Sequence, residues 1–206
     1  MNRVVVYIDG FNLYFGLKAR GWRRFYWLDP RLLARNLLKP RQQLVCVKYF
    51  TARISAHPSD PGKQKRQATW LEALETLPDT KVFYGHYLPK EQRCFNCGAT
   101  WIAHEEKMTD VNIAVELLRD AYDDQFDTAL VISADSDLAP PIEAVLTKFP
   151  RKRVIVICPP ERQSKKLETV ASAMFRLGRK MLQDSQLPDT YAKPDGYVLK
   201  RPESWK

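Results

Sequence analysis

Aspartates stand at the ends of two hydrophobic runs, where their side chains could bind a cation. Asp9 ends the run VVVYID, and Asp135 and Asp137 follow the run TALVI in the motif SADSD. A carboxylate at the end of a buried strand is costly unless water or a cation offsets its charge. Carboxylate oxygens without His or Cys among them suit Mg²⁺ or Mn²⁺.

These aspartates also have a purely structural interpretation as helix caps. Asp9 is suited to cap a helix that starts near Phe11, and Asp137 is suited to cap the helix that begins at Pro140. Capping accounts for one acid of SADSD but leaves Asp135 unexplained. On local sequence alone, both interpretations of Asp9 stay open.

A third acidic position lies in the stretch MTDVNIAVELL, whose apolar spacing predicts a helix. Thr109 is the predicted N-cap. The predicted broad apolar stripe consists of Val111, Val115 and Leu118, with Ile113, Ala114 and Leu117 beside them. Asp110 then lies in the first turn, where the helix dipole favours a negative charge. Taken alone, this is an ordinary role for an acid.

Strands and helices alternate along the chain. The apolar runs predict strands at 4–8, 44–50, 81–87, 128–132 and 153–158. Helical spacing predicts helices at 30–38, 65–77, 109–122, 140–148 and 165–181. This alternation implies an α/β fold with a mainly parallel central sheet and helices on both faces.

In such sheets, ligands bind beyond the carboxyl ends of the strands, at the point where the strand order reverses. If the strands ending at Asp9 and before Asp135 are neighbours there, Asp110 and Asp137 can converge on the same edge. Carboxylates at such short distances from one another raise one another's pKa. The sequence therefore predicts a divalent metal site at this edge.

Composition limits the class of protein. The 206 residues with 45% apolar content suit one folded domain, and the net charge of +9 favours an anionic partner such as nucleic acid. No apolar run approaches the roughly 18 residues that span a bilayer, and the N-terminal run is shorter than a signal-peptide core. We therefore expect a cytoplasmic protein with no membrane partner.

Two segments depart from the alternation. Residues 85–107 form an insertion in which His86, Cys94, Cys97 and His104 could bind a structural Zn²⁺, with reduced thiols or a redox pair as alternatives. Residues 183–206 form a basic, Pro-containing C-terminal tail, which we predict to be extended or disordered.

The blocks YIDGFNLYFG, EEKMTDVNIAVELL and LVISADSDLAPPIEAV resemble the signatures of NYN domains, the PIN-like metal-dependent ribonucleases that include the LabA-like bacterial proteins. The resemblance covers nearly the whole chain apart from its tail. It implies a PIN-like, Rossmannoid three-layer sandwich over residues 1–182, with Mg²⁺ or Mn²⁺ in its acidic pocket. By motif, its catalytic residues are Asp9, Asn12, Asp110, Asp135 and Asp137.

The expected activity is hydrolysis of RNA by a metal-activated water. Asp9 and Asp135 would hold the metal directly, and Asp110 and Asp137 would complete its shell. Asn12 would orient a water or a phosphate oxygen, unless it caps the helix that follows.

Basic residues predict the substrate-binding part of the site. The predicted substrate-binding residues are Lys107, Ser133, Arg162, Lys165 and Lys166. Aromatic side chains at 16–27 and 62–70 stand among Lys and Arg; they either stack on a single strand or anchor the core.

Other functions remain open at this point. The chain could be a non-catalytic nucleic-acid-binding or scaffold module, or a nuclease that cuts DNA. A phosphatase of the haloacid-dehalogenase type is disfavoured, because that pattern needs an acid two residues after Asp9, where this chain has Phe11. A homodimer is compatible with the sequence.

Overall fold

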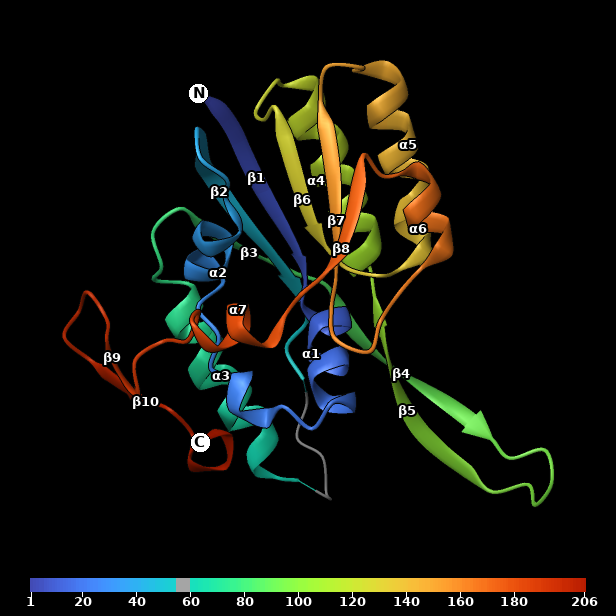
Figure 1. Cartoon of the computed structure of the whole chain (residues 1–206). Coiled ribbons are helices and arrows are strands. Elements are labelled where there is room, and N and C mark those ends of the chain that lie inside the picture. The colour runs from blue at the N-terminus through green and yellow to red at the C-terminus, as the bar shows by residue number, and fades with distance from the viewer. Residues whose placement is uncertain (55–59) are drawn as a thin grey trace.

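The fold is built on a six-stranded sheet in the order β3-β2-β1-β6-β7-β8, and every neighbouring pair in it is parallel (Figure 1). The computed structural model describes residues 1–54 and 60–206, with the backbone alone for 87–91 and 101–106. The strands of this sheet are β1 (Asn2–Asp9), β2 (Gln42–Thr51), β3 (Thr80–Tyr84), β6 (Thr128–Ile132), β7 (Arg153–Cys158) and β8 (Ala173–Arg176).

Helices cover both faces of the sheet, so the predicted three-layer α/β sandwich is confirmed. One hydrophobic core lies between the sheet and α1 (Gly10–Ala19), α2 (Pro30–Leu37), α3 (Gly62–Leu74) and α7 (Arg179–Gln183). The other core lies beneath α4 (Thr109–Tyr122), α5 (Ala139–Lys148) and α6 (Lys165–Val170). Side chains of β1 alternate between the two cores, as expected for a central strand.

The strand order reverses between β1 and β6. β1 pairs with β2 on one side and with β6 on the other, and Ile8 lies opposite Ile132 in that second pair. The residues that follow these two strands therefore meet at one edge of the sheet. This confirms the predicted adjacency on which the acidic site depends.

The predicted helix at 165–181 is wrong. It is divided into α6, the edge strand β8 and α7. β8 pairs with β7, where Ala173 lies opposite Ile155, and the Ser172 N–H donates to the Val154 carbonyl at 2.9 Å. Helical spacing could not reveal this, because pairing with a strand remote from the segment decides its conformation.

The C-terminal tail is folded rather than extended. Its elements are β9 (Thr190–Ala192), β10 (Val198–Lys200) and the short 3₁₀ helix η3 (Glu203–Trp205). Leu199 is buried, and the ring of Trp205 packs edge-on against that of Tyr26, with 5.6 Å between the ring centroids. Lys193 pairs with Glu72 of α3 at 2.6 Å. The aromatic contact and the ion pair hold a polar sequence that has no helical or strand period of its own.

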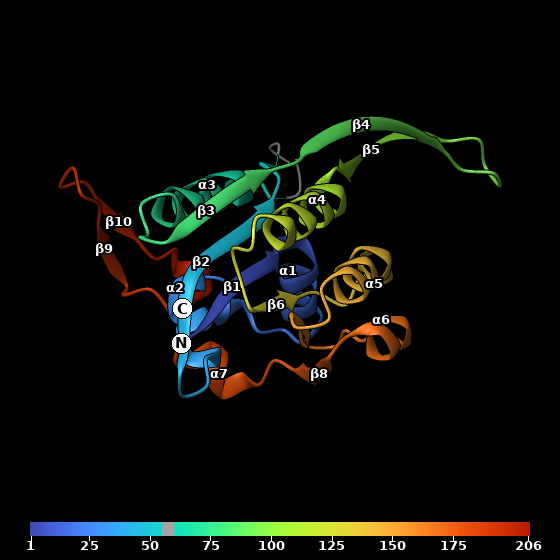
Figure 2. The same ribbon diagram turned by 90° about the horizontal axis from the view of Figure 1, so that it is seen from above.

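The insertion forms an antiparallel hairpin of β4 (His86–Arg93) and β5 (Thr100–Lys107). It projects from the body of the molecule beyond the start of α4 (Figures 1 and 2). Across the described part of the chain, every helix is too short or too polar to cross a bilayer.

Candidate active site

Asp9 caps a helix and also reaches across the point of strand reversal. Its side chain is only 3% exposed. Oδ1 accepts a hydrogen bond from the Asn12 N–H at 2.9 Å, which caps α1, and Oδ2 accepts from Ser133 Oγ at 2.8 Å. The cap and a role at the acidic edge are thus compatible, because each carboxylate oxygen contacts a different segment.

Ser133 and Asn12 join the loops that follow β1 and β6. Ser133 Oγ also accepts from the Asp135 N–H at 3.0 Å, and Asn12 Oδ1 accepts from the Ala134 N–H at 3.1 Å. Ser133 is fully buried, which contradicts the prediction that it binds substrate. Its hydroxyl instead fixes the position of Asp9 relative to the Asp135 backbone.

The capping roles within SADSD are the reverse of those expected. Asp135 Oδ1 accepts from the Asp137 N–H at 3.0 Å and caps the 3₁₀ helix η2 (Ser136–Leu138). Leu138 is the N-cap of α5 and has no capping side chain, so Asp137 does not cap it. A 3₁₀ turn inserted before the prolines causes the difference. Asp137 is left exposed at the edge of the sheet.

Asp110 lies in the first turn of α4, as predicted. The N-cap is Met108, at a positive φ of 76°, and Thr109 is a buried first helical residue rather than the cap. α4 packs against η2 and against β1. The helix that carries Asp110 is therefore in contact with both segments that carry the other aspartates.

The predicted apolar stripe of α4 is only partly buried. Val111 and Val115 are 57% and 54% exposed. The buried face carries Ile113 and Leu117 of the predicted stripe, with Ala121 and two acids described next. Apolar spacing did not reveal the two acids.

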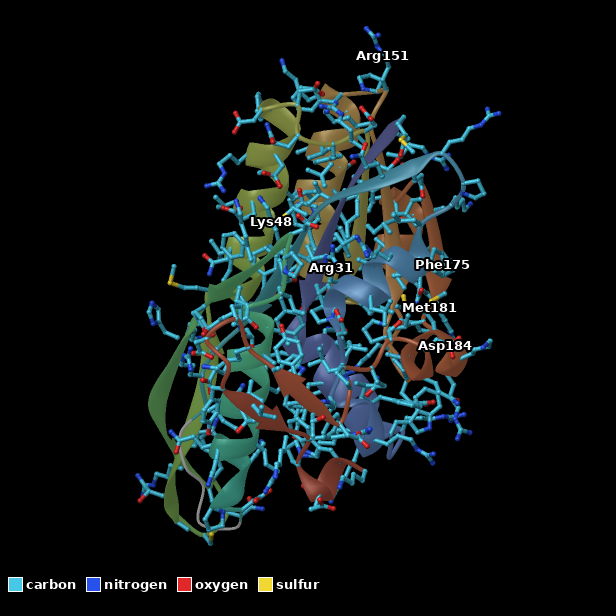
Figure 3. All side chains as sticks on the ribbon, turned by 90° about the vertical axis from the view of Figure 1, so that its left-hand side faces the viewer. Arg31, Lys48, Arg151, Phe175, Met181 and Asp184 are labelled. Atoms are coloured by element: carbon cyan, nitrogen blue, oxygen red, sulfur yellow. The ribbon has the colours of Figure 1, made fainter. Side chains whose placement is uncertain are left out.

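Lys48 of β2 explains why acids are buried on α4. Its Nζ lies 2.7 Å from Glu116 and 2.6 Å from Asp120, and all three residues are 5% exposed. The Tyr7 hydroxyl donates to Asp120 at 2.5 Å; burial, and then the charge of Asp120, raise the pKa of Tyr7. Figure 3 labels Lys48 beside α4. This cluster fastens the helix that carries Asp110 to the sheet.

A divalent cation fits the donor chemistry of this edge. Asp9, Asp110, Asp135 and Asp137 supply only hard oxygen ligands. A carboxylate oxygen has about two lone-pair sites, so an oxygen that accepts a hydrogen bond can also bind an ion. Among the described side chains, however, no three His, Cys, Asp or Glu residues are grouped closely enough to hold an ion. The ligand set is therefore not closed around an ion in this conformation.

Predicted phosphate-binding residues lie around the same edge. Lys165 and Lys166 are exposed in the first turn of α6, which packs against η2. Arg162 follows β7, with its side chain against Gly16 of α1. Lys107 is the last residue of β5, directly before the start of α4.

Residues 16–27 and 62–70, in which aromatic side chains stand among Lys and Arg, contribute rings to the core. Phe25 is 2% exposed, and Trp70 is 8% exposed with its indole N–H donating to the Leu28 carbonyl. The anchoring interpretation is therefore correct for these two rings.

The predicted zinc ligands cannot meet on one ion within one chain. His86 lies opposite Lys107 at the base of the hairpin, whereas Cys94 and Cys97 lie at its tip. At about 3.3 Å per residue, the strand between them separates His86 from Cys94 by about 26 Å. The backbone of His104 lies opposite Pro89, again away from the tip, and its side chain is outside the described part of the chain.

A groove of about 530 Å³ lies elsewhere, between α2, β8 and α7. Phe175, Met181 and Asp184, labelled in Figure 3, contribute to its lining. None of the predicted site residues lines this groove, so it is separate from the acidic edge.

Tyr49 belongs to the acidic edge, although sequence reasoning missed it. It is the β2 neighbour of Ile8 and is 3% exposed. Burial, and then the negative charge of Asp9, raise the pKa of its hydroxyl. The sequence signal that could have identified Tyr49 is a polar aromatic residue near the carboxyl end of a predicted strand.

Gly10 is required where β1 turns into α1. A carbon added there would lie 2.6 Å from the Phe50 carbonyl oxygen and 2.7 Å from Tyr49 Oη. We expect Gly10→Ala to lower the free energy of unfolding by about 1–3 kcal/mol, as overpacking does. Gly178→Ala, where nothing lies within 4 Å, is the control and should change it by less than about 1 kcal/mol. Urea denaturation measures both, and equal effects would contradict the prediction.

Comparison with known proteins identifies the family. The NYN domain matches residues 3–178, most of the 206-residue chain. The chain is a member of the NYN domain family. This NYN protein is also 25% identical over 239 aligned positions to 6-hydroxy-3-succinoylpyridine 3-monooxygenase HspA of Pseudomonas putida, covering 98% of this chain and 75% of that protein.

The NYN fold is also seen in a solved structure. A Vibrio parahaemolyticus protein of unknown function superposes with a TM-score of 0.57 at 19% identity, covering 90% of this chain and 96% of that one. This likeness supports the PIN-like fold of the NYN protein.

Proposed function

We propose that this NYN protein is a metal-dependent endoribonuclease. The observation that carries the proposal is the hydrogen-bonded link from Asp9 through Ser133 to Asp135, across the point where the strand order reverses. Ligand sites of parallel α/β sheets form at that point. Membership of the NYN family and the net charge of +9 agree with an RNA substrate.

Asp9 and Asp135 are the proposed direct ligands of Mg²⁺ or Mn²⁺, with Asp110 and Asp137 completing the shell. When bound, such an ion supplies a water of lowered pKa and positive charge near the phosphate oxygens. The hydrogen bonds from Ser133 and from the Asn12 N–H hold the Asp9 carboxylate in one orientation. Asn12 holds the two loops together through its Oδ1, and its amide nitrogen would donate to a phosphate oxygen.

Lys165 and Lys166 would bind the phosphates of the RNA strand on one side of the edge, and Arg162 would add a guanidinium there. Lys107 would approach from the base of the hairpin. Such contacts are independent of sequence and make binding weaker as salt rises.

Removal of metal tests the proposal. We expect a 5′-labelled RNA to be cut with Mg²⁺ or Mn²⁺, to stay intact with EDTA, and to be cut again when metal is restored. Because water rather than the ribose 2′-hydroxyl attacks, the products should contain no 2′,3′-cyclic phosphate, and RNA with 2′-O-methyl riboses should still be cut. Cleavage that persists in EDTA, or cyclic phosphate ends, would argue against it. The rate of cleavage of DNA with the same sequence shows whether the protein prefers ribose to deoxyribose.

A second candidate function follows from the monooxygenase relative, whose alignment covers 98% of this chain. If the chain shares that activity, one oxygen atom of O₂ would enter a product of 6-hydroxy-3-succinoylpyridine, and a reductant would convert the other oxygen atom to water. Incubation with this compound, isotopically labelled O₂ and a reduced nicotinamide, followed by mass spectrometry, tests it. A product that carries one labelled oxygen atom supports the oxygenase, and unchanged substrate argues against it.

A further inference from the structure

The hairpin of β4 and β5 carries a Cys-x-x-Cys turn at its tip, outside the proposed nuclease site. Arg93 pairs with Thr100 as the last step of the ladder, and Cys94 and Cys97 follow within the turn. The hairpin projects away from the layers of the fold in both views (Figures 1 and 2). Both cysteines are free thiols, and Cys97 is exposed.

The turn is shaped to present two sulfur ligands. Cys94 and Cys97 are separated by two residues, the spacing of the two-cysteine half of a structural zinc site. The Gly98 N–H donates to the Cys94 carbonyl at 2.9 Å, and Gly98 has a positive φ of 71° that suits glycine. This hydrogen bond closes the turn that carries both cysteines.

Within the described part of the chain, the hairpin tip offers two of the four ligands of a zinc site, Cys94 and Cys97. A structural Zn²⁺ takes four Cys or His ligands at about 2.0–2.3 Å. Of the other cysteines, Cys46 is on β2 and Cys158 is buried at the end of β7, both in the body of the molecule. Among the described side chains, no group of three ligands exists. Within that part of the chain, a four-ligand site at the tip needs two further ligands from another molecule.

We propose that a second copy of this chain supplies them, so that Cys94 and Cys97 of two hairpin tips bind one Zn²⁺ in a four-cysteine site. A two-fold axis through the ion makes the two halves identical, which is the commonest symmetry of protein dimers. The hairpin projects from the body of the chain (Figures 1 and 2). Two such tips would meet while the two bodies stay apart.

Residues beside the cysteines suit this contact between tips. Phe95 is fully exposed at the tip, and the partner's tip would cover its ring. Four thiols lose their protons on binding Zn²⁺, which leaves the site with a charge of −2. The Arg93 guanidinium lies beside Gly98, so one arginine from each copy offsets that charge.

The test uses the full chain, reduced with a phosphine, loaded with Zn²⁺ and desalted. Elemental analysis gives zinc per chain, and light scattering gives the mass in solution. We expect one zinc for every two chains and twice the mass of one chain, with both lost on adding a strong chelator. Cys97→Ser should remove the zinc and leave monomers, whereas the control Cys46→Ser, on β2, should behave as the unaltered protein.

Several results would overturn the proposal: one zinc per monomer, no retained zinc, or a dimer that persists in chelator or in Cys97→Ser. A dimer split only by reductant would indicate a disulfide and overturn it equally. The readouts are metal content and mass, so the result does not depend on whether the chain cleaves RNA. Circular dichroism of Cys97→Ser confirms that the exposed substitution leaves the fold intact.

Discussion

Asp9→Asn is expected to lower metal-dependent RNA cleavage by more than about 100-fold, because even partners outside the metal ligands cost 10- to 100-fold. The substitution removes the charge and little else. Asparagine caps helices as well as aspartate does, so the amide oxygen of the variant can still accept from the Asn12 N–H. The new amide nitrogen can donate to Ser133 Oγ, since a hydroxyl both donates and accepts. Initial rates on a labelled RNA at saturating Mn²⁺ measure the effect.

Three further variants sharpen this result. Asp135→Asn should lose as much activity as Asp9→Asn, and Ser133→Ala should lose about 10- to 100-fold, because it only positions the acids. Asp123→Asn, an exposed position at the carboxyl end of α4, should keep the full rate. Thermal unfolding should show that Asp9→Asn remains folded. A folded Asp9→Asn protein with the full rate would remove Asp9 from the mechanism.

Lys48→Met is expected to lower the free energy of unfolding by about 3–5 kcal/mol, the cost of leaving buried charges without their partner. Glu116 and Asp120 are 5% exposed, and both would lose the buried cation of β2. Among the described residues, Glu116 would keep only the half-exposed Arg119 as a charged partner. Methionine keeps most of the volume and the apolar stem, so the loss reports on charge. Urea denaturation measures it.

Compensation distinguishes buried charge from lost packing. Adding Glu116→Gln and Asp120→Asn to Lys48→Met removes the buried negative charges and keeps an acceptor for the Tyr7 hydroxyl. We expect the triple variant to recover much of the lost stability. Lys65→Met, at an exposed position of α3, is the matched control and should cost less than about 0.5 kcal/mol. A triple variant as unstable as the single one would show that packing dominates.

Where sequence reasoning succeeded, local pattern and global fold agree. β6, β7 and α4 have the predicted bounds, because buried runs and helical spacing there are uninterrupted. The aspartates stand at strand ends and a helix start, positions that a parallel sheet brings to one edge. Their convergence required β1 and β6 to be neighbours, and the pairing of these two strands supplies that condition.

Where it failed, distant partners decided the outcome. Glu116 and Asp120 face the interior because Lys48 lies there, and no spacing on α4 reveals a lysine 68 residues away. β8 is a strand because β7 offers it an edge. The tail is folded because Trp205 packs against the ring of Tyr26 and Lys193 pairs with the carboxylate of Glu72.

The sequence by itself determined the α/β class, the NYN motifs and the identity of the acidic residues, because these depend on residue type and short-range spacing. Only the tertiary structure decided what each residue does. It made Ser133 a buried link between Asp9 and Asp135, it made Asp135 rather than Asp137 the cap, and it separated His86 from the cysteines of the hairpin tip. The physical reason is that hydrogen bonds and ion pairs form between atoms that meet in space, and that meeting is fixed by the packing of segments far apart in the chain.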